Sequence, residues 1–396
     1  MRFLKKQIFP PPVAAERFKE KLMTKSLKLA LASVILTFGT TNLYPQSEAG
    51  APFLLIAPGA RASAMGEANV AIAEDAVGGF YNPAGIAWSK GRELSFMRSK
   101  WLPGLVDDIS YNFVGYRQHI EGLGSVGGHL IYMDLGEQIR TGENSPDEID
   151  RFQSFMLAIA GTYGADLSES STIGVTVKFV HQNLAPFGAG KEQGKGTSSS
   201  FAFDVGYLGR DKFINGLDLG IALANIGPKI KFIDANQADP MPMNLKVGFA
   251  YLIFDGEFNS LQVVYDLNKL LVASYPDRDL DNNNIKGEIN VKGEEAHKDP
   301  FYRAIITSWS DDSAELEWQE VIHNVGLEYW YSGLVALRAG FFRDYYLRDE
   351  KDDVAIMKTL GIGIRYGNYG FDFGYVDGPK GHPITNTMRF SLNMSF

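Results

Sequence analysis

From about residue 92 onward the chain repeats one pattern, in which roughly ten residues of alternating large apolar and small or polar side chains precede a turn or loop. In residues 171–180, for example, Ile173, Val175, Val177 and Phe179 alternate with Gly174, Thr176 and Lys178. Successive side chains of a strand point to opposite faces, so this period of two predicts β-strands. Residues 201–207, 217–224, 245–251 and 360–366 repeat it. Each strand is expected to have one bulky face and one small or charged face.

The pattern predicts about fourteen strands, near residues 92–99, 108–119, 123–134, 151–164, 171–182, 198–208, 216–226, 243–253, 259–270, 319–331, 334–342, 357–367, 369–377 and 386–396. Long connections follow the odd strands, at 135–150, 183–197, 227–242, 271–318 and 343–356. Short ones follow the even strands, at 120–122, 165–170, 254–258, 332–333 and Asn368. A soluble sandwich would also alternate, but short turns at one end and long loops at the other are typical of outer-membrane barrels. The predicted fold class is all-β: a transmembrane antiparallel β-barrel of about 14 strands.

The last predicted strand places Phe390, Leu392, Met394 and Phe396 on one face. The alternative interpretation is an edge strand of a soluble protein, where such an apolar edge would promote aggregation. In a closed barrel the same strand pairs with the first one and its apolar face meets lipid. The aromatic C-terminus therefore favours the barrel.

The N-terminal region carries an export signal. After Met23 come Lys25 and Lys28, an apolar stretch at 29–38 and then polar residues to Gly50, which is the order of a secretory signal. The apolar stretch is shorter than the roughly 20 residues a membrane helix needs. We predict a signal peptide at residues 1–49, cleaved between 46 and 50. Residues 1–22 form either a long basic region or an upstream extension of a chain that starts at Met23.

Residues 50–91 do not resemble barrel wall. The part from Phe53 to Trp88 alternates poorly and is dense in Ala and Gly, which permit close packing, and Asn82-Pro83 begins a turn. We predict that residues 50–91 plug the lumen of a barrel formed by 92–396. A loosely ordered periplasmic tail is the alternative.

Several stretches carry a family resemblance. Residues 59–62, 64–66, 74–76 and 82–87 resemble the N-terminal signature shared by FadL-like barrels and the PorV family. The opening at 53–58 favours PorV, as do residues 326–331, 337–342 and 386–392, which resemble late strands of that family. Gly59 departs from the pattern, because an acidic residue is usual there, and Ser63-Ala64 replaces a more glycine-rich pair.

The resemblance implies a fourteen-stranded outer-membrane barrel with a non-enzymatic role in type IX protein secretion. Such a protein would receive or shuttle exported cargo through the cargo's C-terminal signal domain, and a larger outer-membrane translocon subunit is a further expected partner. The alternative is a FadL-like outer-membrane transporter of small hydrophobic molecules. An apolar pocket beside the N-terminal segment would favour that alternative.

Charged residues of both signs fall on the faces assigned to the lumen: Arg61, Asp75, Lys178, Asp204, Asp218, Lys246, Asp266, Glu328, Arg338, Arg365, Asp372 and Arg389. Charges in a protein-filled lumen need partners, so we predict a self-paired network between plug and wall. A transport path lined by these charges is the alternative.

Composition argues against other chemistries. The chain has no cysteine, which excludes disulfides and thiolate sites, and its net charge of -9 has no dense basic face for nucleic acid. His119, His129, His181, His297, His323 and His382 are dispersed and form no hydrolase or metalloprotease motif. We therefore expect no catalytic residues, no cofactor and no nucleic-acid partner.

Two features lie in the loop at 271–318. Asp277, Asp279, Asp281 and Glu288 match the spacing of an EF-hand calcium loop, but Asn282 occupies the glycine position and no flanking helix pair is evident. A solvated acidic loop is the simpler interpretation, and no metal site is predicted. Residues 308–319 are expected to form a short helix capped by Asp312 or Ser313, with Leu316 facing inward. This loop is our predicted cargo contact.

Overall fold

The computed structural model describes residues 49–103, 106, 108–142, 145–186, 195–232, 238–272, 299–310, 314–348, 354–380, 382 and 384–396. All of them belong to one of two compact units of the chain, Tyr44–Phe396. The predicted signal peptide up to residue 48 and the acidic loop at 277–288 lie outside the described residues. The division of the chain at 49/50 stays a prediction.

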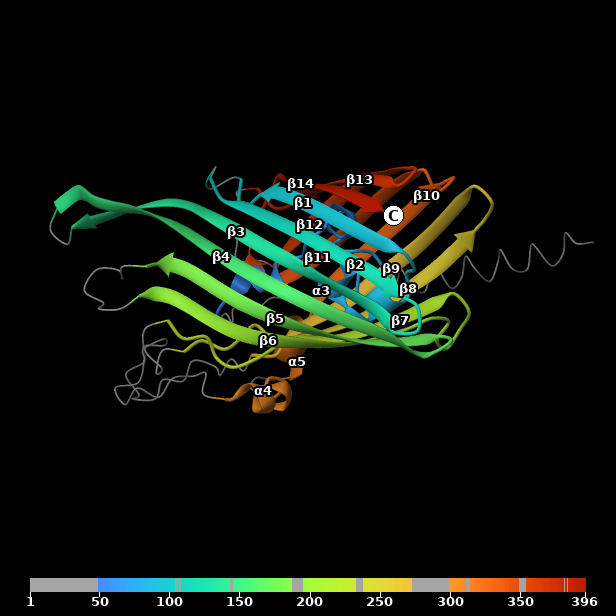
Figure 1. Ribbon diagram of the computed structural model, residues 1–396, viewed down its shortest axis with the longest axis horizontal. Coiled ribbons are helices and arrows are strands. Elements are labelled where there is room, and N and C mark those ends of the chain that lie inside the picture. Colours follow the sequence, from blue (N-terminus) through green and yellow to red (C-terminus); the bar gives the residue numbers. More distant parts are fainter. Residues whose placement is uncertain are drawn as a thin grey trace, which may run out of the picture. The chain divides into compact units, whose positions relative to one another are not determined.

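The described residues form a closed antiparallel barrel of fourteen strands, which confirms the predicted fold class (Figure 1). The strands are β1 (Arg92–Lys100), β2 (Ser110–Ile120), β3 (Gly124–Gly142), β4 (Ser145–Ser168), β5 (Ser171–Ala185), β6 (Gly196–Gly209), β7 (Leu217–Ile226), β8 (Asn244–Asp255), β9 (Asn259–Leu270), β10 (Ile322–Tyr331), β11 (Val335–Arg348), β12 (Val354–Tyr366), β13 (Tyr369–Asp377) and β14 (Thr387–Ser395). Each strand pairs with the next, and β14 pairs with β1.

The two faces of the wall differ as the alternation predicts. On β5, Ile173, Val175 and Val177 are 44%, 49% and 48% exposed, whereas Thr176 and Lys178 are buried. Bulky side chains therefore point outward, where a soluble protein would have polar ones, and small or charged side chains point into the barrel. This is the inverse of a water-exposed sandwich and is the surface that lipid requires.

The C-terminal strand closes the barrel. Leu392 of β14 lies opposite Phe96 of β1, and Met394 lies opposite Leu94. Phe390 and Leu392 are exposed on the outer face. Because both edges of β14 are paired, with β13 and with β1, no apolar strand edge is left open at this position.

The predicted loop at 135–150 is wrong. β3 continues to Gly142 and β4 starts at Ser145, so the two strands form a long ribbon that reaches beyond its neighbours (Figure 1). A bulge at Leu135–Gly136 marks where the ribbon leaves the wall, and Gly136 has a φ of +79°. Beyond it both faces are exposed to solvent, so the apolar alternation that reveals a strand disappears. The connections predicted at 183–197 and 343–356 are shorter for the same reason, because the flanking strands extend into them.

Helical pieces are short. Residues 49–91 contain η1 (Pro52–Leu55), α2 (Ala60–Ser63), α3 (Gly78–Tyr81) and η2 (Pro83–Ala87), with η denoting a 3₁₀ helix. The predicted helix at 308–319 is confirmed only for α5 (Ala314–Gln319), and α4 (Phe301–Thr307) was not predicted. Ser308 instead caps the end of α4, and Asp312 and Ser313 lie outside the described residues. Within the described part of the chain, no helix is long and apolar enough to cross a membrane.

Candidate functional site

Residues 49–91, called the N-terminal segment below, lie against inward-facing residues of the wall. The backbone amide of Ala60 donates to Ser391 Oγ on β14 (2.9 Å), and that of Gly66 donates to Thr359 Oγ1 on β12 (2.9 Å). Asn82 Nδ2 donates to the carbonyl of Tyr207 on β6 (2.9 Å). The contacts reach strands on opposite sides of the barrel, so the segment lies within the lumen.

Wall glycines make room for the segment. A Cβ atom on Gly174 of β5 would overlap the backbone of Pro83, and one on Gly340 of β11 would overlap the backbone of Met65 and Gly66. Close backbone approach of this kind is possible only where the wall residue has no side chain. The small inward face predicted from the sequence therefore has a specific role, which is to let the segment pack directly on the sheet.

A series of linked ion pairs joins the segment to four strands. Arg61 binds Glu328 of β10 with two hydrogen bonds of 2.9 Å. Glu328 also accepts from Arg338 of β11 (2.7 Å), which donates to Asp372 of β13 (2.8 Å), and Asp372 pairs with Arg365 of β12 (2.8 Å). The side chains of Glu328 and Arg338 are fully buried. Two parallel bonds between a guanidinium and a carboxylate fix orientation as well as charge.

At the other end of this series of ion pairs, Arg61 pairs with Asp75 of its own segment (3.4 Å). Burial alone would lower the pKa of Arg61, but the Glu328 carboxylate outweighs this and holds the pKa above its ordinary value. The guanidinium is therefore a permanent positive charge in the lumen, matched by carboxylates of the wall and of the segment.

A second pair of wall charges binds the segment elsewhere. Asp266 of β9 accepts the backbone amides of Asn69 (2.6 Å) and Val70 (2.9 Å), and Arg389 of β14 pairs with Glu67 (3.0 Å). Burial raises the pKa of Glu67, and the ion pair with Arg389 only partly offsets it. Arg389 also donates to the carbonyl of Ala57 (2.6 Å).

Most of the predicted lumen charges are thus paired between wall and segment or within the wall. Lys178 binds Asp204 (2.8 Å) and Asn225 Oδ1 (2.7 Å), all three being buried. Asp218 differs, because its carboxylate accepts the backbone amide of Asp211 in a turn and does not bind the segment. Lys246 also differs, because its ammonium lies over aromatic rings, at 4.9 Å from the Phe80 ring centre.

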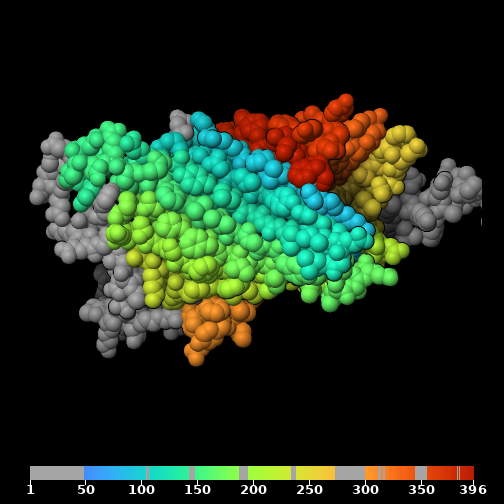
Figure 2. Space-filling model, viewed as in Figure 1, coloured from blue at the N-terminus to red at the C-terminus, as the bar shows by residue number. Residues whose placement is uncertain are grey.

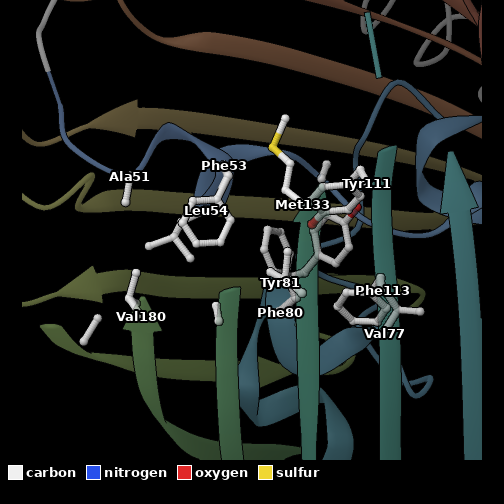
Figure 3. Packing of buried hydrophobic residues seen from close by; sticks show 14 of the residues in the cluster. Ala51, Phe53, Leu54, Val77, Phe80, Tyr81, Tyr111, Phe113, Met133 and Val180 are labelled. Carbon is white, nitrogen blue, oxygen red and sulfur yellow. The ribbon is translucent and has the colours of Figure 1, made fainter. Parts of the chain in front are cut away.

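Apolar side chains complete the packing between segment and wall (Figure 3). Phe53 and Leu54 of the segment lie in one buried cluster with Tyr111 and Phe113 of β2. Phe80 packs edge-on against His129 of β3, with ring centres 5.9 Å apart. Burying these side chains stabilises the packing, because it removes apolar area from water. The segment is held by packing as well as by charge.

Beside the segment lies a cavity of about 520 Å³. Its apolar lining includes Leu55, Phe80, Leu270, Ile322 and Phe342. Its polar lining consists of Glu67, Asp239, Asn244, Lys246, Asp266, Asn268 and Asn324. Among the described residues, the buried Asp266 Oδ1 and Asn268 Oδ1 atoms find no hydrogen-bond partner. The cavity is therefore mixed in character, and it is a pocket that the sequence did not predict.

Several contact residues were missed in the sequence. Glu67, the partner of Arg389, and Asn225, the partner of Lys178, belong to no alternating pattern. Asn225 has a φ of +59° at a point where the pairing of β6 and β7 shifts, which inserts its side chain among the lumen charges. Asn82 was visible only as a turn residue, although its side chain also bonds β6.

Metal ligands do not gather in the part of the chain that the structure describes: no group of three or more His, Cys, Asp or Glu side chains could hold an ion there. The acidic loop at 277–288 lies outside those residues.

Comparison with protein families identifies the chain. The family model of the type IX secretion system protein PorV matches residues 46–277, more than half of the sequence and all of the N-terminal segment. The chain belongs to the PorV family. Membership and the outward apolar face of the barrel place this PorV-family protein in the bacterial outer membrane.

Solved structures with a similar fold include a FadL homologue of Pseudomonas aeruginosa, which is 11% identical over 85% of this chain and 98% of its own, with a TM-score of 0.46. The Pseudomonas putida toluene transporter TodX is 11% identical over 86% and 98%, with a TM-score of 0.48. The Ralstonia pickettii toluene transporter TbuX is 12% identical over 87% and 100%, with a TM-score of 0.45. No curated protein matches the chain in sequence.

Proposed function

We propose that this PorV-family barrel is a non-enzymatic component of type IX secretion that receives exported cargo through the cargo's C-terminal signal domain. The observation that carries the proposal is the family match over residues 46–277. The lumen supports it, because its charges are largely paired with one another and with the N-terminal segment. A barrel filled in this way is suited to presenting a surface to a protein partner, and a larger translocon subunit is the second partner we propose.

The outer end offers the surface for cargo. Long connections lie at the end opposite the short turns, which is the extracellular end of an outer-membrane barrel. We assign cargo contact to the connection between β9 and β10, residues 271–318, whose described part includes α4 and most of α5. Loops held on a rigid scaffold commonly carry binding residues.

The test is a binding measurement on the purified barrel. A tagged chain is mixed with an exported protein that carries its C-terminal signal domain, and with the same protein lacking that domain. Retention of the first but not the second is the expected result. Replacing residues 271–318 by a short turn should abolish retention, and unchanged retention would refute the assignment of this loop.

A second function has one observation in its favour, the cavity beside the N-terminal segment. Small-molecule sites are concave and mostly apolar, with a few converging polar groups, and Leu55, Phe80 and Lys246 supply both kinds of lining. The cavity would suit a small hydrophobic molecule with a polar end, as in a FadL-like transporter.

Uptake of a radiolabelled fatty acid into proteoliposomes measures this second function. Leu270→Trp, which should fill the cavity, would abolish uptake if the cavity is on the path, whereas Ile362→Trp on the outer wall is the matched control. Uptake of the fatty acid without any retention of cargo would favour transport over cargo reception as the function of the barrel.

A further inference from the structure

The helices α4 and α5 lie on the outside of the wall. Ala304 and Ile305 of α4 pack in one cluster with Leu223 of β7 and Leu245 of β8. Leu223 and Leu245 lie opposite each other at outward-facing positions of the paired strands, next to the inward Ala222 and Lys246. In Figure 2 α4, in orange, projects from the outer surface of the barrel. α4 therefore packs against the outside of the barrel wall and not over its mouth.

The free side of α4 is largely apolar, although Arg303 is also exposed. Three large side chains lie on this side: Tyr302 and Ile306 of α4, and Trp309 in the turn directly after the helix, spaced four and three residues apart. They are 61%, 73% and 47% exposed. A surface helix of a water-soluble protein has the opposite arrangement, with its polar side outward.

The polar groups under the helices are neutralised. Lys269 of β9 points outward yet is almost fully buried, because its ammonium binds Glu317 (2.6 Å) and Glu320 (2.8 Å). Trp309 lies over the same ammonium at 5.3 Å from the ring centre. An unpaired lysine on the lipid face of a barrel is destabilising, and these pairs remove that cost.

The apolar side of α4 continues the lipid-facing surface of the wall. Two residues along β7 and β8 from Leu223 and Leu245 lie Ile221 and Val247, on the same outward apolar face of the wall. Ile221 is 38% exposed. α4 lies where this apolar outer face ends, toward the extracellular end of the strands. Tyr and Trp are the residues that concentrate at the boundary between acyl chains and headgroups.

We propose that α4 and α5 form an interfacial anchor, with Tyr302, Ile306 and Trp309 inserted among the lipids of the outer leaflet. The occupant of this surface is lipid and not protein, because the surface is continuous with the apolar outer face of the wall and the charges beneath the helices, Lys269, Glu317 and Glu320, are paired with one another. The anchor would hold the C-terminal end of the proposed cargo loop at the membrane surface. This inference does not depend on the proposed function.

The chain has no cysteine, so a single spin label can be placed at will. Ile306→Cys is labelled with a nitroxide, and the barrel is reconstituted alone in dioleoylphosphatidylcholine vesicles. Collision with oxygen, which concentrates in lipid, is compared with collision with a water-soluble nickel chelate. Ile362→Cys on the lipid-facing wall and Ile139→Cys on the projecting β3–β4 ribbon are the reference positions, both being exposed apolar residues of the barrel.

We expect the oxygen-to-nickel collision ratio at Ile306 to exceed that at Ile139 severalfold and to lie below that at Ile362. A ratio equal to that at Ile139 would place the helix in water and overturn the proposal. Shielding from both reagents would indicate coverage by protein and would also overturn it. Tyr302→Cys must give the same ranking, and heat-dependent migration on gels shows that each labelled barrel is folded.

Discussion

Single charges decide how the N-terminal segment is held. Glu328 is the shared partner of Arg61 and Arg338, so it joins the segment to the wall. The sequence identified all three as lumen residues, because each falls on a predicted inward face or in the family signature. The sequence could not show which of these residues pair with each other, since that depends on the register of strands far apart in the chain.

Removing Glu328 should therefore destabilise the barrel. In Glu328→Gln the fully buried Arg338 and the partly buried Arg61 lose their shared carboxylate. Breaking a buried ion pair from one side costs about 3–5 kcal/mol. Chemical unfolding of the barrel in detergent measures the loss. Arg151→Gln, which breaks exposed pairs on the β3–β4 ribbon, is the control and should leave the free energy of unfolding unchanged.

A wall glycine gives a second residue-scale test. Gly174→Val should force the backbone of Pro83 away from β5, because the added side chain occupies its place. The released segment should then be cut by trypsin at Arg61 in the intact barrel. Gly161→Val is the matched control, since a Cβ there meets nothing within 4 Å. Equal protection of both variants would contradict the close packing inferred at Gly174.

At the scale of elements, alternation predicted strands well wherever one face meets lipid and the other meets the segment. Strand existence and order were correct, and β14 was placed almost residue for residue. The failure at 135–150 has a clear cause, because a ribbon exposed on both faces has no reason to alternate. α4 was missed because its apolar residues face outward, which hides the pattern of an ordinary surface helix.

The projecting ribbon should be dispensable for folding. Replacing residues 137–153 by a tight turn removes strand pairs that lie beyond the ends of β2 and β5, so the closed part of the wall keeps its pairing. Heat-dependent gel migration of the shortened chain should match that of the parent. A lower transition temperature would show that the ribbon stabilises the wall.

For the whole molecule, two inferences rest on different grounds. The closed, outward-apolar barrel follows from the alternation and is confirmed by the structure. Its proposed role in secretion rests on family membership, since neither the paired charges nor the cavity identifies a cargo. The alternation of side chains could predict the barrel, but partner recognition depends on exposed loops, where burial imposes no pattern.

The most direct test of cargo reception is made in cells that lack this chain. The location of an exported protein with a type IX C-terminal signal domain is followed by fractionation. Our account predicts that the protein accumulates in the periplasm and that the parent chain restores its export. Restoration should also occur with Leu270→Trp, whose cavity is filled. Unchanged export in the absence of the chain would contradict the proposed function.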